Sequence, residues 1–451
     1  MSMFGKSLNI VILGVVLSST SPAQSKLIVG YYPSWSKSSY PHTVVLYRHL
    51  THIAHAFIFP TADGNLDLSG FSPYPELIQS AHQNGVKVVI SVGGWDPART
   101  PRFRQMVADS NARKRFVAAL KDLCTTYGYN GADIDWEYPE AQDKVSGAQL
   151  FRELHEAFSK IVPALSLSIA APSSDWQDGY DWAVMNQVLD WMGVMTYDFY
   201  GSWTSKAGPN SPLFGDNSLE GYVHKSVLYY QAKGVPPSKL LIGTPFYGWQ
   251  FNASAMYGAS SGASQLPYNS IAPLLQQGWT RTWDTTTKVP HIINADRTRV
   301  ISYDDTVSIS EKTNYVKAQQ LGGTIIWALG QDYLLNGQQP LLNAVGNGLR
   351  TTTGIAHAIV ATIPRSCDLL QNFPNPFNAQ TRIRYHIARA GRYVLRISDV
   401  LGRGVTTLAD HEHQPGSYEV TISSDALSSG VYLYRLSGEG TMLTRTMVVL
   451  R

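Results

Sequence analysis

Short runs of apolar and β-branched residues alternate with amphipathic stretches over the first three quarters of the chain. Such alternation is typical of βαβ units, in which buried parallel strands are joined by helices packed on their outer faces. The intervening segments 102–125 and 147–161 have helical spacing. The predicted strands span residues 27–32, 52–59, 86–92, 131–137, 165–171, 191–197, 240–247 and 323–329. This pattern predicts an α/β fold, a (β/α)8 TIM barrel over residues 24–349.

The longest interval between two predicted strands separates the seventh from the eighth. This segment, from about residue 250 to about residue 300, is rich in Gly, Ser and Thr and has scattered aromatic residues. This composition predicts a small insertion of loops and short strands. Trp249, Tyr268, Trp279 and Trp283 are candidates to line a cleft from this region, without an assigned role.

The pattern changes near residue 350. Residues 350–366 have the composition of a linker, and no helical spacing follows them. The predicted strands there alternate apolar and polar residues and span 381–387, 391–399, 416–422, 430–436 and 442–450. The remainder, residues 367–451, is therefore predicted to be a small antiparallel β-sandwich.

Residues 1–23 have the form of a signal peptide. Lys6 precedes an apolar run that is too short to span a bilayer, and small residues precede a cleavage point after Ala23. No other long apolar stretch exists, so no transmembrane segment is expected. The two cysteines, Cys124 and Cys367, fall in different predicted domains, which excludes a disulfide framework; Cys124 is expected to be a buried free thiol.

Charge adds little to this picture. The chain has 36 basic and 33 acidic residues and a formal net charge of +3, so nothing indicates nucleic acid as a partner. The 11 Trp and 25 Tyr residues suit a protein that stacks on flat sugar faces, although most aromatic residues serve cores.

Three carboxylates stand two residues apart at Asp133, Asp135 and Glu137. In a strand these side chains share one face, with Cα atoms roughly 6–7 Å apart. Inside a barrel, burial and mutual repulsion would keep a proton on at least one of them. A protonated carboxyl beside an ionised one can then serve in acid/base catalysis. The alternative is a half-exposed edge strand with solvated acids. The apolar face formed by Ala132, Ile134 and Trp136 favours the barrel, because that face needs covering by helices.

Together with other segments, this triplet resembles the signature of glycoside hydrolase family 18, the chitinases. The other segments follow in that family's order: SVGGW at 91–95, MTYD at 195–198, GTPFYG at 243–248 and GGTIIW at 322–327. The resemblance implies substrate-assisted retaining hydrolysis, in which the acetamido oxygen of the −1 sugar attacks its own anomeric carbon. Glu137 would then be the general acid and base, Asp135 would orient the acetamido group, and Asp133 would share a proton with Asp135.

The resemblance also assigns roles to residues outside the triplet. Tyr197 would hydrogen-bond the acetamido oxygen, and Asp198 would contact the sugar or its N-acetyl group. Trp327 would form the floor of the −1 subsite, although core packing is the alternative for it. Other residues of these motifs would line the substrate site: Tyr31, Ser91, Gly94, Tyr138, Met195 and Tyr247. Ser91 would hydrogen-bond Asp133, and core packing is an alternative for Tyr31.

Trp95 and Trp203 match positions whose rings flank the +1 and +2 sugars. The chain departs from the family at Asn130, where an acid is usual, and at Trp249, where many members have Arg, so the support for Asp198 is expected to differ. The insertion is shorter than that of deep-cleft members, which bears on processivity. No metal or other cofactor is implied by any of these motifs.

The C-terminal part resembles a type IX secretion sorting domain. The segments LQNFPNPFN at 370–378, DVLGR at 399–403 and SSGVYLYRL at 428–436 carry this resemblance. It implies export through the outer membrane of a Gram-negative bacterium with the type IX secretion machinery as partner, followed by release or surface attachment. A carbohydrate-binding sandwich is the alternative, and it would need an exposed aromatic row; Tyr432 and Tyr434 share a face, but in an apolar strand.

Three functions are compatible with the sequence. The first is a secreted, monomeric chitinase acting on β-1,4-linked N-acetylglucosamine polymers, with chitin or chito-oligosaccharides as partners. The second is an endo-β-N-acetylglucosaminidase acting on N-glycan cores, and the third is a non-catalytic chitin-binding lectin on the same barrel. Lectins of this kind typically lose the acid at Glu137, which is present here.

Overall fold

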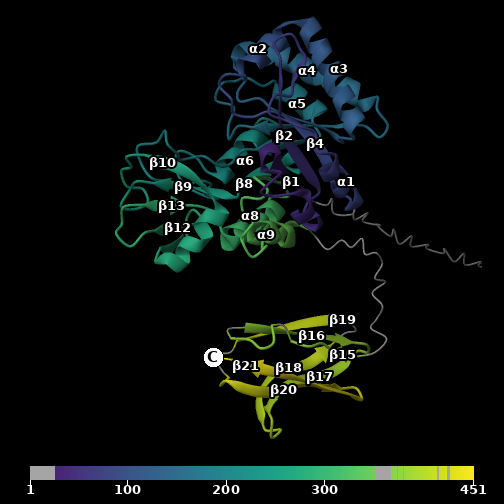
Figure 1. Ribbon diagram of the computed structural model, residues 1–451, viewed down its shortest axis with the longest axis vertical. Helices are drawn as coiled ribbons and strands as arrows, with labels where there is room; N and C mark the ends of the chain where they lie inside the picture. Colours follow the sequence, from purple (N-terminus) through teal and green to yellow (C-terminus); the bar gives the residue numbers. More distant parts are fainter. Residues whose placement is uncertain are drawn as a thin grey trace, which may run out of the picture. The chain divides into compact units, whose positions relative to one another are not determined.

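The computed structural model describes residues 26–350, 367–372, 374–378, 380–413, 416–423 and 427–450. The predicted signal peptide and all but the first residue of the predicted linker lie outside these ranges. The chain divides into two compact units, Met1–Thr351 and Thr352–Arg451 (Figure 1). None of the helices in the described ranges is long and apolar enough to span a membrane.

The first unit contains a closed barrel of eight parallel strands, as predicted. Its strands are β1 (Leu27–Pro33), β2 (His52–Pro60), β4 (Lys87–Gly93), β5 (Gly131–Asp135), β6 (Ser166–Ala171), β7 (Trp191–Val194), β8 (Leu240–Pro245) and β14 (Gly323–Trp327). Their order around the barrel is β1-β14-β8-β7-β6-β5-β4-β2, and a pairing of β1 with β2 closes it. A two-residue strand, β3 (Leu66–Asp67), extends the sheet beside β2.

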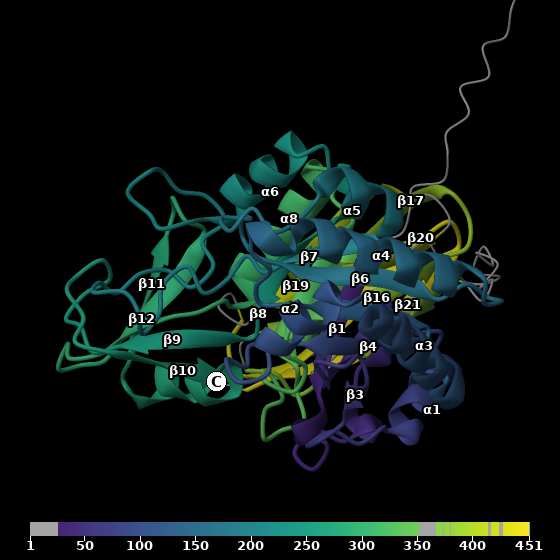
Figure 2. The same ribbon diagram turned by 90° about the horizontal axis from the view of Figure 1, so that it is seen from above.

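Helices connect these strands and pack on the barrel (Figures 1 and 2). They are α1 (Pro75–Gln83), α2 (Pro101–Ala108), α3 (Ser110–Tyr127), α4 (Lys144–Ser159), α5 (Trp182–Val188), α6 (Val223–Ala232), α8 (Thr306–Ala318) and α9 (Pro340–Leu349). The single helix predicted over 102–125 is two helices. Asp109 separates them because its backbone is extended and its carboxylate caps α3 by accepting from the amides of Asn111 and Ala112.

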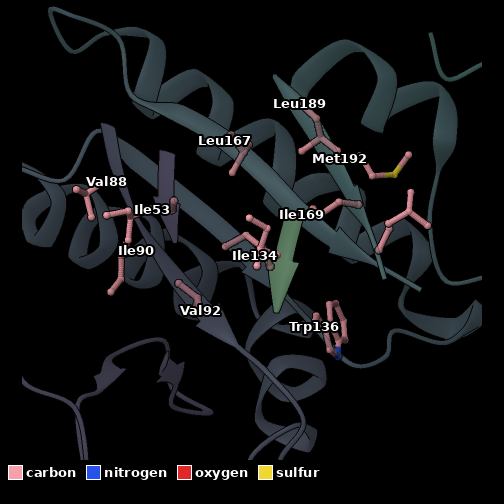
Figure 3. Packing of buried hydrophobic residues seen from close by; sticks show 14 of the residues in the cluster. Ile53, Val88, Ile90, Val92, Ile134, Trp136, Leu167, Ile169, Leu189 and Met192 are labelled. Atoms are coloured by element: carbon pink, nitrogen blue, oxygen red, sulfur yellow. The ribbon is translucent and has the colours of Figure 1, made fainter. Parts of the chain in front are cut away.

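The two faces of β5 explain how the acids come to lie inside. Ala132, Ile134 and Trp136 belong to the apolar layer between strands and helices, and Figure 3 shows Ile134 and Trp136 among its side chains. The ring of Trp136 stacks on Phe103 of α2 with centroids 5.3 Å apart. Because successive side chains of a strand point to opposite faces, Asp133 and Asp135 face the barrel interior, as predicted.

The insertion forms a sheet of its own. Its five short antiparallel strands lie in the order β10-β9-β13-β12-β11 beside the barrel strands in Figure 2. They are β9 (Tyr247–Phe251), β10 (Ala263–Pro267), β11 (Thr280–Asp284), β12 (Val289–Ile293) and β13 (Val300–Ser302), with a short helix α7 (Tyr268–Ile271) after β10. Tyr268 and Trp279 pack against the apolar cluster of this insertion. Trp283 lies beneath the guanidinium of Arg281, 5.5 Å away.

The second unit consists of two antiparallel sheets around one apolar cluster, which confirms the predicted sandwich. One sheet holds β15 (Asp368–Leu369), β16 (Gln380–Ile387) and β19 (Gly416–Ser423); the other holds β18 (Gly404–His413), β17 (Gly391–Asp399), β20 (Gly430–Gly438) and β21 (Thr441–Val449). The sequence pattern missed β18. This edge strand buries few side chains, Ala409 and His413 among them, so it lacks the alternation of a half-buried strand.

Candidate active site

Asp133 lies deepest of the three acids and is held by three hydroxyl groups. Its Oδ2 accepts from Tyr31 Oη at 2.7 Å and from Ser91 Oγ at 2.9 Å, and its Oδ1 accepts from Ser168 Oγ at 2.7 Å. Ser91 and Ser168 face Asp133 because β4 and β6 pair with β5 in register at this residue. Burial raises the pKa of Asp133, and the three hydrogen bonds act against that rise.

Asp135 is buried next along the strand and has an oxygen that lacks a partner. Oδ1 of Asp135 receives no hydrogen bond from any described residue. Burial, followed by the charges of Glu137 and Asp133, raises the pKa of Asp135 well above its usual range. The interaction between its side chain and that of Glu137 has opposite effects on the two groups: it raises the pKa of Asp135 and lowers the pKa of Glu137. Proton sharing with Asp133 stays a prediction.

Glu137 lies two residues beyond β5, because the strand ends at Asp135 rather than at residue 137. Burial raises the pKa of Glu137 to about 7, and the charge of Asp198 adds to this rise; hydrogen bonds with Tyr138 and Asp135 act in the opposite direction. A carboxyl group with this pKa is part protonated near neutral pH. It can therefore give a proton and later take one.

Asp198 approaches these acids from the segment after β7, which ends at Val194, three residues earlier than predicted. Its Oδ1 accepts from Tyr247 Oη at 2.6 Å and from Trp249 Nε1 at 2.7 Å. Trp249 thus supplies a neutral donor where the resemblance leads one to expect Arg. Burial raises the pKa of Asp198, and these two hydrogen bonds oppose the rise.

Tyr197 lies close enough to both Asp135 and Asp198 to feel their charges. Burial and then the charges of Asp135 and Asp198 raise its pKa well above the usual range, so its phenol remains a donor. Its ring meets that of Tyr247 edge to face, with centroids 6.1 Å apart.

The segment that carries Tyr197 and Asp198 is anchored to the insertion and α8 by buried polar groups. Ser211 Oγ donates to the carbonyl of Thr196 at 2.6 Å and accepts from Lys312 Nζ at 2.7 Å. Lys312 also pairs with Asp304 at 2.7 Å, and both side chains are 1% exposed. Nothing in the sequence pattern singled out these residues.

An aromatic floor lies within the barrel mouth. The ring of Trp327 stacks on Phe57 with centroids 5.6 Å apart, and Tyr31 meets it edge-on at 5.7 Å. Gly94 has a φ of +88°, and a Cβ on it would lie 2.7 Å from the ring of Phe57. Phe57, which comes from β2, was missed by sequence reasoning because it lies within an apolar run. Met195 is half-buried and packs beside this group.

Four exposed tryptophans contact other aromatic rings of the barrel unit. Trp35, Trp95, Trp176 and Trp203 are each 60% to 70% exposed. Tyr138 connects two of them, with ring centroids 6.5 Å from Trp95 and 4.8 Å from Trp176. Trp203 meets Trp249 edge to face at 5.4 Å. The sequence motifs had pointed to Trp95 and Trp203 but not to Trp35 or Trp176.

Buried acid/base carboxyls at the carboxyl ends of parallel barrel strands, over an aromatic floor, define a hydrolase for carbohydrate. The family model described as "Glycosyl hydrolases family 18" matches residues 27–332, which is more than half of the chain. The chain therefore belongs to this family and is an enzyme of the glycoside hydrolase class. A second match, "Secretion system C-terminal sorting domain", covers residues 371–450 and confirms the predicted sorting domain.

Known proteins resemble the barrel unit at moderate identity. "Probable chitinase 2" of Drosophila melanogaster is 28% identical over 71% of this chain and 75% of its own length. "Oviduct-specific glycoprotein" of Ovis aries is 32% identical over 76% of this chain and 70% of its own length. The crystal structure of a Group IV chitinase from Ostrinia furnacalis is 27% identical, with a TM-score of 0.66 over 72% of this chain and 100% of that chain.

Proposed function

We propose that the protein is a secreted chitinase that hydrolyses β-1,4-linked N-acetylglucosamine polymers with retention of anomeric configuration. The observation that carries this proposal is the unpartnered Oδ1 of Asp135, a buried acceptor beside Glu137. Buried polar atoms without partners are rare in folded proteins, so a substrate donor is the natural partner for this one. The N–H of an acetamido group is such a donor.

In the proposed first step, Asp135 and Glu137 hold one proton between them. Glu137 donates it to the glycosidic oxygen, and the C1–O bond breaks as the acetamido oxygen of the same sugar bonds to C1. Asp135, now ionised, accepts from the acetamido N–H and stabilises the oxazolinium cation. The phenol of Tyr197 donates to the acetamido oxygen. The elevated pKa of Glu137 supports its role as the acid.

The second step reverses the proton transfer. Glu137, now a carboxylate, removes a proton from a water molecule that attacks C1, and the C1–O bond of the oxazolinium ring breaks. Two displacements at C1 restore the original configuration. Trp327 stacks on the apolar face of the reacting sugar, and the exposed tryptophans favour an extended chain of flat sugars as substrate.

The test compares the wild-type protein with Glu137→Gln on soluble chito-oligosaccharides and follows product anomers by NMR. Retention predicts that β-anomer forms first, and the loss of the acid should lower kcat by about 10²- to 10⁴-fold. Glu140→Gln is the matched control, because Glu140 lies on the same loop in a surface ion pair with Arg104. Initial α-anomer would contradict retention. Full activity in Glu137→Gln would remove Glu137 from its role.

The same assay separates the alternatives. A glycopeptide with an N-glycan core tests for endo-β-N-acetylglucosaminidase activity. If the protein cleaves this glycopeptide and no chito-oligosaccharide, the N-glycan core replaces chitin as the proposed substrate. Binding of chito-oligosaccharide without any cleavage would indicate a lectin, which the retained Glu137 argues against.

We also propose an export route with the predicted domain boundaries: a signal peptide over 1–23, the catalytic domain over 24–349, a linker over 350–366 and the sorting domain over 367–451. The sorting domain supports export by a type IX system of a Gram-negative bacterium. Mass spectrometry of the exported protein should find Gln24 at its N-terminus, and retention of residues 1–23 would refute the proposed cleavage. A monomer remains a prediction, which sedimentation would test.

A further inference from the structure

Asn210 is a fully buried residue between β7 and α6 that hydrogen-bonds on all sides. Its Oδ1 accepts from the amide of Asp198 at 2.9 Å, and its Nδ2 donates to the carbonyl of Tyr247 at 3.2 Å. Its own amide donates to Ser302 Oγ at 2.7 Å, and its carbonyl accepts from the amide of Phe199 at 3.2 Å. Asn210 thus joins the segment after β7 to β9 and β13 of the insertion.

The backbone of Asp198 needs such support. Its φ is +58°, in the left-handed region that residues other than Gly rarely adopt. A backbone conformation of this kind persists only where its surroundings hold it. Asn210 binds the amides of both Asp198 and Phe199, so it holds the two peptide groups that set the direction of the Asp198 side chain.

The same side chain also determines where the partner of Asp198 lies. Tyr247 donates its phenol proton to Asp198 at 2.6 Å, while its carbonyl accepts from Asn210. One amide side chain therefore fixes the backbone at both ends of the Asp198–Tyr247 hydrogen bond. A shift of Asn210 would move both ends relative to Glu137.

We propose that Asn210 is a positioning residue for catalysis, which holds the Asp198 carboxylate and the Tyr247 phenol in their working geometry and makes β13 part of the catalytic framework through Ser302. This proposal rests on the proposed function, in which Glu137 is the acid and Asp198 is a charged group close to it. It differs from a purely structural role, in which Asn210 would only fill a buried polar site and each folded molecule would retain full activity.

The test replaces the amide by an apolar group of similar size. In Asn210→Leu we expect kcat per folded molecule to fall by roughly 10- to 100-fold, because small misplacements of catalytic groups have effects of this size. KM for chito-oligosaccharides should stay within about twofold, since Trp327 and the exposed tryptophans are unchanged. Calorimetric binding in the Glu137→Gln background checks the affinity directly.

Asn343→Leu is the matched control. Asn343 also accepts and donates through its side chain, from His49 at 2.8 Å and to the carbonyl of Gln339 at 2.7 Å, but it lies on α9. Its replacement should lower stability without changing kcat per folded molecule. Wild-type kcat in folded Asn210→Leu, or a rise in KM alone, would overturn the proposal.

A milder variant, Ser302→Ala, tests the same proposal if Asn210→Leu does not fold. Ser302→Ala removes only the bond from the Asn210 amide to the insertion and should lower kcat about 3- to 10-fold with unchanged KM; unchanged kcat in a folded Ser302→Ala protein would then overturn the proposal. Wild-type cleavage, measured first, tests the proposed function separately, so failure of the wild-type arm and failure of the Asn210 arm are distinguishable.

Discussion

Asp198→Asn isolates the electrostatic effect of one carboxylate on the catalytic acid. The substitution keeps the size of the side chain and removes its negative charge. Asp198 is half-buried, with two neutral donors on Oδ1, and its charge raises the pKa of Glu137. Removal of the charge should therefore lower the pKa of Glu137 and move the alkaline limb of the pH profile of kcat/KM to lower pH.

The size of the effect is bounded by the pKa itself. Burial, the larger cause, persists in the variant, so the pKa of Glu137 should fall between about 7 and the 4.5 of an ordinary glutamate. A fall of about one pH unit would reduce the protonated fraction at pH 7 from roughly one half to roughly one eleventh. Activity at pH 7 would then drop about fivefold further than activity at pH 5.

The assay measures kcat/KM for a soluble chito-oligosaccharide between about pH 4 and pH 9. Tyr247→Phe is the control, because it removes a neutral donor to Asp198 and leaves the charge in place. Its alkaline limb should stay near that of the wild type or lie above it. An alkaline limb in Asp198→Asn at or above the wild-type pH would refute the electrostatic reasoning, whatever the loss of rate.

Two further substitutions test the buried charges. Lys312→Met leaves the Asp304 carboxylate buried without its cation, which should cost about 3–5 kcal/mol of unfolding free energy at neutral pH. The unpaired acid then has a raised pKa in the folded state, so this cost should fade below about pH 4, where Asp304 is protonated in both the folded and the unfolded state. Urea unfolding at pH 7 and pH 4 measures the cost, and equal costs at the two pH values would contradict the reasoning. Adding Asp304→Leu to Lys312→Met should restore stability. Asp133→Asn removes a charge that raises the pKa of Asp135, so the acid limb of the pH profile of kcat/KM should move to lower pH while measurable turnover remains. An acid limb at the wild-type pH would count against this coupling of Asp133 and Asp135.

The barrel and the identity of its acids were accessible from the pattern of residues alone. Parallel strands are buried on both faces, so they appear as apolar runs that the pattern detects, and β5 was recognisable because its two faces differ so clearly. Strand ends were less accessible. The pattern extended β5 to Glu137 and β7 to Tyr197, because alternation continues past the last ladder hydrogen bond. The sequence pattern missed the edge strand β18 because that strand has no continuous buried face.

What the sequence determined was the chemistry: three acids at spacing two, aromatic residues for sugar faces, and a barrel to enclose them. Only the tertiary structure decided how these groups cooperate. The three hydroxyls on Asp133 come from β1, β4 and β6, the free oxygen of Asp135 comes from β5, and both neutral donors on Asp198 come from β9. Asn210 is twelve residues from Asp198 and 37 from Tyr247, yet it binds both. Such contacts arise from barrel closure and from packing of the insertion, and the local periodicity of the sequence predicts neither of them.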